Sequence, residues 1–328
     1  MQRNTTAPAP AEKTVRRKLS RERVQKFLMG TRDKNGFLKL VAIYGLLICI
    51  GFIYLYPILY MVSASFMTLD DLLDSSIQWI PSSLNLSNYR QASASMDYWN
   101  SLLQSFMIAG LPTLCTLVSC SLTGYGLARF KFRGRGAIIG LIILTFVLPS
   151  QITMIPTYVM YSKLGILNSV WAFIVPALLA MGLNAPIFIM IFWQFFRTVP
   201  QALIEAAKID GAGPLKSFFS ISLPSAAPAF ITVALFSFVW YWNEFYLTQL
   251  YVHGVLTDSG LTTLIIQLQN FNANYNTYAQ TASGGATSLN ESIKMAGTLI
   301  AVLPLLILYF ILQRHFVESI DRTGITGE

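Results

Sequence analysis

The sequence predicts an all-α, polytopic membrane protein with six transmembrane helices and both termini in the cytoplasm, and three observations support this fold class. First, 54% of the 328 residues are hydrophobic and only 12% are charged, whereas soluble domains carry roughly 25% charged residues. Second, the apolar residues form runs of the length, about 20 residues, that an α-helix needs to cross a bilayer. Third, the basic residues gather in every second connection between these runs, which indicates an orientation.

Residues 1–37 are predicted to form a basic cytoplasmic tail, because 11 of the 23 Lys and Arg precede residue 40. The first ten residues are rich in Thr, Ala and Pro and should be disordered. Residues 15–28 allow either a weak amphipathic helix on an anionic membrane surface or a solvated tail. The net charge of +8 is explained by topology and lipid headgroups, so no nucleic-acid partner is needed.

Six apolar runs form a predicted transmembrane domain of residues 38–315, which a cytoplasmic tail of residues 316–328 follows. The predicted spans are residues 38–66, 99–128, 137–161, 170–196, 229–252 and 293–313. Three cysteines, Cys49, Cys115 and Cys120, lie inside the spans. They are expected to be small buried hydrophobic residues, and neither a disulfide framework nor a metal site is predicted.

The distribution of basic residues sets the predicted orientation. About 20 of the 23 Lys and Arg lie in the N-terminal tail, after the second span, between the fourth and fifth spans and at the C-terminus. The opposite side holds Arg90, Lys163 and Lys294. Because basic residues concentrate in cytoplasmic loops, both termini and the segment 198–224 are predicted to be cytoplasmic.

The segment 198–224 is predicted to hold a short, soluble-looking helix between two membrane spans. Thr198 is the expected N-cap and Pro200 suits a first helical turn. Leu203, Ala206 and Ala207 fall on one helical face. From chemistry alone, such a helix either packs on its own protein or docks into a groove of a soluble partner.

A glycine is predicted to end this helix and to let a second one begin. Gly211 is expected to adopt a positive φ, the conformation that glycine tolerates best at a helix C-terminus. Pro214 can start the second helix. Phe218, Phe219 and Leu223 are expected to form the apolar side of that helix.

Residues 205–212, with the sequence EAAKIDGA, resemble the EAA signature of binding-protein-dependent ABC importer permeases. In that family this loop is a coupling helix that inserts into a cleft of the ATP-binding subunit. The resemblance implies ATPase-coupling roles for Glu205, Ala206, Ala207, Asp210, Gly211 and Ala212.

The resemblance extends over residues 38–327 and points to the shorter, second permease of maltose-type carbohydrate importers. The stretches that carry it are LPSQ at 148–151, LGILN at 164–168, WNEF at 242–245 and the closing span at 303–314. It implies a type I ABC importer permease fold in the cytoplasmic (inner) membrane of a bacterium or archaeon. The implied partners are a homologous second permease, two ATP-binding subunits that hold ATP and Mg, an extracytoplasmic solute-binding protein, the sugar and the lipid bilayer. No cofactor, metal or enzymatic activity is implied for this chain itself.

Polar groups inside the predicted spans are candidates for a substrate path. Gln151 lies between two prolines that free backbone carbonyls for hydrogen bonding, although a helix–helix hydrogen bond is an alternative role. Asn184 and Asn243 are further candidates. Glu244, the one acid in a span core, either faces water, sugar or a basic partner or reaches the outer interface. Trp240 either stacks on a sugar or belongs to an interfacial aromatic belt.

The outer connection, residues 253–292, is rich in amides and hydroxyls. Phe271, Tyr275 and Tyr278 are the predicted contacts with the solute-binding protein, because aromatic rings add contact area at little entropic cost. A disordered connector is the alternative.

The sequence therefore predicts the permease subunit of an ATP-driven oligosaccharide importer. A permease for another solute, such as a polyol, glycerol phosphate or sugar acid, remains an alternative. Residues 211–217 lack the adjacent Gly-Lys pair of a phosphate loop and follow a helix instead of a strand, so ATP is not expected to bind this chain. An ion-coupled secondary carrier would require buried acid–base relays and clear repeats, but the span cores hold only Glu244 and the sequence shows no clear repeat. A membrane enzyme would require clustered His, Asp or Cys ligands, which the sequence lacks.

Overall fold

The computed structural model describes residues 30–31, 34–77, 79–253, 261–283 and 288–324. These residues are almost entirely helical, and the strands among them are the antiparallel two-residue pair β1 (Gly30–Thr31) and β2 (Lys34–Asn35). The predicted helical class is thereby confirmed. Most of the predicted N-terminal tail lies outside the described residues. The chain divides into two compact units, residues 1–63 and 64–328.

The first unit contains nearly all of α2 (Phe37–Ser65), which confirms the first predicted apolar helix. The helix has a mean hydropathy of 2.3 over residues 38–65. Its large side chains, such as Leu47 and Tyr54, are exposed. An apolar helix with this surface is suited to contact with lipid or with another membrane helix.

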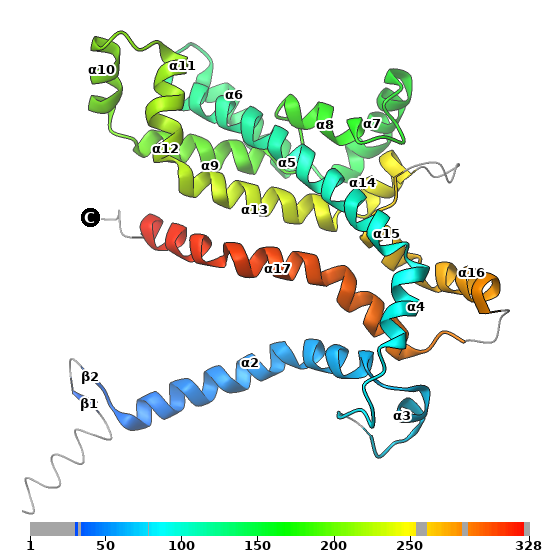
Figure 1. Cartoon of the computed structure of the whole chain (residues 1–328). Helices are drawn as coiled ribbons and strands as arrows, with labels where there is room; N and C mark the ends of the chain where they lie inside the picture. The colour runs from blue at the N-terminus through cyan, green and yellow to red at the C-terminus, as the bar shows by residue number, and fades with distance from the viewer. Residues whose placement is uncertain (1–29, 32–33, 78, 254–260, 284–287, 325–328) are drawn as a thin grey trace, which may run out of the picture. The chain divides into compact units, whose positions relative to one another are not determined.

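The second unit is organised around α5 (Tyr98–Arg129), a continuous helix of 32 residues that confirms the second predicted span. Three helices pack along it: α8 (Trp171–Leu178), α9 (Ala185–Thr198) and α13 (Ala227–Asn243) (Figure 1). At Gly124, an added Cβ would lie 2.7 Å from the Cβ of Phe192 and 2.9 Å from the backbone nitrogen of Trp193. Glycine is therefore needed for the close approach of α5 and α9.

One face of α9 supplies much of the core beneath α5. Phe188, Phe192 and Phe196 are fully buried, and their spacing of four residues places them on the same side of the helix. Phe230 of α13 packs against them, with its ring centroid 4.6 Å from that of Phe192. Large buried aromatic rings of this kind dominate the packing energy of a helical core.

The third, fourth and fifth predicted spans are broken helices, so the prediction that each is one continuous run is wrong. The third consists of α6 (Arg135–Val147) and α7 (Ser150–Leu164), which meet at an angle of 97°. Pro149 lies in the break, and the helical conformation is disfavoured for the residue before a proline, here Leu148. Between α8 and α9, Ala180 and Asn184 have positive φ values of 56° and 54°. Within the described residues three helices are long and apolar enough to cross a membrane, or up to six if each bent pair counts as one span.

The fifth predicted span also ends early. α13 stops at Asn243 and is followed by α14 (Tyr246–Thr248) and the π-helix η2 (Gln249–His253). The sixth is continuous but longer than predicted, since α17 runs from Glu291 to Gly324. The first part of the predicted C-terminal tail is therefore a continuation of the last helix.

The two polar connections are helical. The first holds α3 (Leu69–Leu73) and α4 (Ser87–Ser95), and the second holds α15 (Leu264–Gln269) and α16 (Phe271–Ser283). α4 packs against α16 and α17. Asn88 of α4 is buried, and its Nδ2 donates to the carbonyl oxygens of Ser65 and Met67, each at 2.9 Å. α4, α15 and α16 form a cap at one end of α5, while α10 and α11, described next, lie at the other (Figure 1).

Candidate functional site

The candidate site is the segment that connects α9 to α13. It contains α10 (Gln201–Ile209), α11 (Pro214–Ser217), the π-helix η1 (Phe218–Ser222) and α12 (Leu223–Ser225). α10 leaves α9 at an angle of 74°, and the α11–α12 stretch meets α13 at 79°. The segment is thus set off from the bundle at both junctions.

The entry into α10 differs from the prediction. Thr198 is the last residue of α9, and its Oγ1 donates to the carbonyl of Phe195 at 2.8 Å, so it is not the N-cap. Pro200 occupies the cap position with ψ of 132°. Val199 is extended, with ψ of 125°, because the ring of a following proline disfavours the helical conformation.

The outward face of α10 carries the apolar residues that the sequence had placed on one stripe. Ile204 is the buried residue of α10, with 4% of its surface exposed. Leu203 and Ala206 are exposed, and Ala207 is half-buried. Ile209 is 87% exposed. The helix therefore packs on its own protein through a single side chain and leaves its other apolar groups available.

The end of α10 confirms the predicted glycine turn. Gly211 has φ of 76°. The amide of Ala212 donates to the carbonyl of Ala207 at 2.8 Å, and the amide of Gly211 donates to that of Lys208 at 3.1 Å. This pair of bonds is the Schellman motif, which requires a left-handed residue after the C-cap. The C-cap itself is Asp210.

The second helix is only partly as predicted. Pro214 begins it, as expected. Phe218 is buried and Leu223 is half-buried, but Phe219 is 61% exposed. The π-helical turn η1 explains the difference, because i→i+5 hydrogen bonding changes the angular spacing of successive side chains.

Both ends of the segment are held by the last turns of α5. Arg129 donates from Nη2 to the carbonyl of Val199 at 2.8 Å and from Nη1 to Oε1 of Gln201 at 3.2 Å. Tyr125 donates from its hydroxyl to the carbonyl of Pro214 at 3.3 Å. Residues four apart lie on the same face of a helix. One face of α5 therefore fixes the entry to α10 and the start of α11.

An aromatic cluster reinforces this attachment. The ring of Tyr125 lies 5.0 Å from Phe218, 5.5 Å from Phe196 and 6.2 Å from Phe130. Phe196 comes from α9 and Phe218 from η1, so the rings join the chain before and after α10. From the sequence, Arg129 was only one of the basic residues after the second predicted span, and Tyr125 was not a candidate residue. Nothing in local sequence links either residue to partners about 70 or more positions away.

The candidate substrate-path residues lie at breaks and helix ends. Gln151 is exposed in the first turn of α7, next to the 97° bend, and does not lie inside a continuous span. Asn184 occupies the N-cap position of α9. Asn243 ends α13 and donates from Nδ2 to the carbonyl of Val239 at 3.0 Å. Trp240 is half-buried, with its ring 5.2 Å from that of Phe188.

Glu244 lies in the break after α13 and not in a helical span core as predicted. Its Oε1 accepts a hydrogen bond from the amide of Leu247 at 3.0 Å. Its backbone carbonyl accepts one from Oγ1 of Thr248 at 2.6 Å. The carboxylate thus accepts a hydrogen bond from a backbone amide at the start of α14, as the side chain of an N-terminal cap does.

The predicted aromatic contacts with a solute-binding protein are mostly turned inward. Phe271 is 4% exposed and Tyr275 is fully buried, with its hydroxyl donating to Oε1 of Gln91 at 2.7 Å. Tyr278 is half-buried. The prediction that Phe271 and Tyr275 present their rings at the surface is therefore wrong, because these rings pack the cap together. The exposed face of α16 carries Asn272, Asn276, Thr277 and Gln280 instead.

Comparison with known proteins adds a family and a fold. The family described as "Binding-protein-dependent transport system inner membrane component" matches residues 121–322. The polygalacturonan/rhamnogalacturonan transport system permease protein YtcP of Bacillus subtilis (strain 168) is 32% identical over 288 residues, which cover 87% of this chain and 97% of that protein. The arabinooligosaccharides transport system permease protein AraQ of Halalkalibacterium halodurans is 30% identical over 281 residues, covering 85% and 93%. In fold, the chain is similar to one from a bacterial ABC transporter involved in the import of the acidic polysaccharide alginate, with a TM-score of 0.71, 22% sequence identity and coverage of 85% and 98%.

Proposed function

Because the chain belongs to the family of binding-protein-dependent transport system inner membrane components, we propose that it is the permease subunit of an ATP-driven carbohydrate importer. The observation that carries this conclusion is its nearly full-length similarity to permeases named for the transport of sugar polymers and oligosaccharides. Such a subunit forms half of the translocation pathway and catalyses no covalent chemistry. ATP and Mg are held by partner subunits.

The proposed topology has six spans, with both termini and the segment 198–224 in the cytoplasm of a bacterial or archaeal cell. The distribution of basic residues supports it. Under this topology residues 1–37 and 316–328 are cytoplasmic and residues 38–315 form the permease domain. The cap formed by α4, α15 and α16 then faces outward, where an extracytoplasmic solute-binding protein delivers the sugar.

The proposed coupling element is α10 with its glycine turn. The residues that contact the ATP-binding subunit are Glu205, Ala206, Ala207, Asp210, Gly211 and Ala212. The exposure of Leu203 and Ile209 supports docking, since α10 buries only Ile204 on its own protein. A helix laid into a partner's groove uses apolar anchors at i, i+3 and i+4, which is the spacing of Leu203, Ala206 and Ala207. Arg129 and Tyr125 would pass movement of α10 to α5 and from there to the bundle.

The substrate path is proposed to run along the breaks in the spans, shared with a homologous second permease. Gln151, Asn184 and Asn243 place amides at these breaks, where irregular backbone in a membrane is tolerated because it lines a cavity or is buried in protein. Glu244 and Trp240 would influence the path by positioning neighbouring residues, because Glu244 is hydrogen-bonded to Leu247 and Trp240 packs on Phe188.

The decisive experiment is reconstitution of this chain with its partner permease, ATP-binding subunits and solute-binding protein in proteoliposomes. Uptake of a radiolabelled oligosaccharide should require both ATP and the binding protein. Uptake by this chain alone, driven by an ion gradient, would refute the importer assignment and favour a secondary carrier.

Docking of α10 is tested separately in the same preparation. Glu205→Lys reverses an exposed charge on α10 and should reduce co-purification of the ATP-binding subunits. Glu291→Lys is the matched control, since Glu291 is also exposed but lies at the opposite end of the proposed topology. Equal subunit ratios in the two variants would count against docking through α10.

A further inference from the structure

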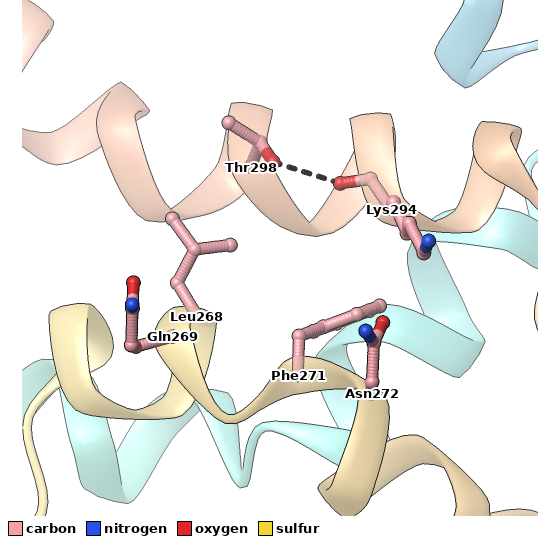
Figure 2. Close-up of a pocket in the computed structure, with 6 residues that line it drawn as sticks. All are labelled: Leu268, Gln269, Phe271, Asn272, Lys294 and Thr298. Carbon is pink, nitrogen blue, oxygen red and sulfur yellow. Dashed lines mark hydrogen bonds between the residues drawn. The ribbon is translucent and has the colours of Figure 1, made fainter.

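A pocket of about 250 Å³ lies where α15, α16 and the first turns of α17 meet (Figure 2). It belongs to the cap at the end of α5 remote from α10 (Figure 1). The lining residues are Leu268, Gln269, Phe271, Asn272, Lys294 and Thr298. They come from α15, α16 and α17, and of these residues only Phe271 was a site candidate from the sequence.

The lining combines hydrogen-bonding groups with an apolar part. Gln269 and Asn272 supply side-chain amides, each with two donors and an acceptor. Thr298 donates its hydroxyl to the carbonyl of Lys294 at 2.9 Å, and its oxygen remains able to accept. Leu268 and the edge of Phe271 supply apolar surface. Such a mixture suits a molecule with several hydroxyl groups and apolar ring faces.

Lys294 adds one isolated positive charge. In the sequence it is the only Lys or Arg between Lys216 and Arg314. Its side chain is half-buried and extends from α17 on the side where α16 begins (Figure 2). Within the described part of the chain its ammonium forms no ion pair. A Lys ammonium carries three donors and no acceptor, so the group it would favour is an anion with several oxygen atoms.

A strip of amides continues from the pocket along α16. Asn272, Asn276 and Gln280 are all exposed, and their spacing of four residues places them on one face of the helix. At 1.5 Å per residue the strip extends roughly 12 Å. It offers uncharged hydrogen-bonding groups in a row, whereas the pocket offers the charge.

We propose that this pocket is an outer subsite for the carboxylate-bearing unit of an acidic oligosaccharide, such as a uronate. The ammonium of Lys294 pairs with the carboxylate, the amides of Gln269 and Asn272 bond the ring hydroxyls, and the α16 strip receives the following sugar units. The proposal rests on the proposed function and names its substrate class. It places the selection for charge in the permease cap as well as in any solute-binding protein.

The test uses the complete transporter in nanodiscs of phosphatidylcholine, without the solute-binding protein. Fluorescently labelled trigalacturonate is the acidic probe, and its methyl ester is the neutral probe of the same size. Binding of each is measured by fluorescence anisotropy. The wild type should bind the acid more tightly than the ester. Lys294→Gln should weaken binding of the acid about tenfold, the value of one charge-assisted hydrogen bond, and leave binding of the ester within about twofold.

Two further variants make the result specific. Lys163→Gln removes an exposed lysine on the same proposed side and should leave both affinities unchanged. Asn272→Ala should weaken the acid and the ester equally, because it removes a contact to hydroxyls. Equal affinity of the wild type for the two probes, or an unchanged affinity for the acid in Lys294→Gln, would overturn the proposal.

A lipid headgroup is the competing anion, because lysines near helix ends also pair with phosphates. If labelled phosphatidylglycerol binds in a Lys294-dependent manner and trigalacturonate does not bind, the ammonium serves lipid and the sugar subsite is refuted. ATP-driven uptake of an oligosaccharide by the wild-type complex is measured in parallel. Its loss would contradict the proposed function, whereas intact uptake with no preference for the acid would contradict only the subsite.

Discussion

Replacement of Arg129 by glutamine should loosen the segment 198–224 at its entry without unfolding the bundle. The substitution removes the bonds from the guanidinium to the carbonyl of Val199, at 2.8 Å, and to Gln201, at 3.2 Å. Val199 is 7% exposed, so its carbonyl would lose its partner in a place with little access to water. The aromatic cluster around Tyr125 stays in place and continues to hold α9 and η1 together.

The expected size of the effect follows from the two bonds. A hydrogen bond to a charged group contributes about 1.5–3 kcal/mol. The contact with Gln201 is exposed and long, so it contributes little. Arg129 is only half-buried, which favours the lower end of that range. The equilibrium between the attached and the detached segment should therefore shift about tenfold.

Hydrogen exchange measures this shift directly. The amides of Asp210, Gly211 and Ala212 are bonded in the C-terminal cap of α10, and their exchange reports local opening of the segment. Exchange in a peptide covering residues 199–214 should accelerate about tenfold in Arg129→Gln. Arg133→Gln is the matched control, because Arg133 is exposed and lies four residues further along. Unchanged exchange in Arg129→Gln, or equal acceleration in both variants, would refute the attachment.

Three further predictions test other parts of the argument. Gly211→Val should abolish ATP-driven uptake but not membrane insertion, since a φ of 76° costs a β-branched residue about 1–3 kcal/mol. Gly213→Val, at an ordinary φ of −69°, should remain active. Uptake by both variants would contradict the need for the glycine turn. Gly124→Ala should lower the melting temperature, because its Cβ would lie 2.7 Å from a side-chain carbon and 2.9 Å from a backbone nitrogen of α9. The overpacking costs about 1–3 kcal/mol, which exceeds the gain of roughly 1 kcal/mol in helix propensity when glycine becomes alanine. Gly126→Ala is the control, because it has the same gain in propensity and its Cβ would have no atom within 4 Å. Equal melting temperatures of the two variants would contradict the close packing. Gln280→Cys, on the exposed face of α16, should react with an impermeant maleimide in intact cells, and labelling only after permeabilisation would invert the proposed topology.

The class of the protein could be predicted from the sequence because it depends on composition and on one local motif. The EAA segment is a continuous octet, and its glycine turn is encoded within six residues. The Schellman bonds of Gly211 and Ala212 need no distant partner. Because the motif and its turn depend only on neighbouring residues, they could be predicted correctly even where the predicted bounds of the spans were wrong.

The breaks in the spans could be predicted only where a residue marks them. Pro149 marks the break between α6 and α7, since proline restricts the residue before it. Ala180 gives no such signal, although its φ is 56°. An apolar run looks the same whether it crosses the membrane once or bends inside the protein, because burial in protein and in lipid both favour apolar side chains.

The helices of the cap could have been predicted from a periodic pattern in the sequence, but the polar composition of this region obscured it. The many amides of residues 253–292 favoured a loop, yet Phe271, Tyr275 and Ala279 recur every four residues and are all buried. That spacing is the amphipathic helical pattern. The same periodicity leaves Asn272, Asn276 and Gln280 outward, so the aromatic residues build the cap and the amides form its surface.

The continuity of α5 gives the broken spans a common frame. At one end its last turns hold the segment 198–224 through Tyr125 and Arg129. At the other end Gln104 accepts from the amide of Thr262, and Oγ of Ser105 accepts from the amide of Leu264 at 2.8 Å. A helix of 32 residues extends roughly 48 Å. Since α5 is continuous over that length, with Pro112 as its internal proline, a displacement of α10 would reach the cap along one helix. Each of the bent pairs would instead absorb part of the displacement at its bend.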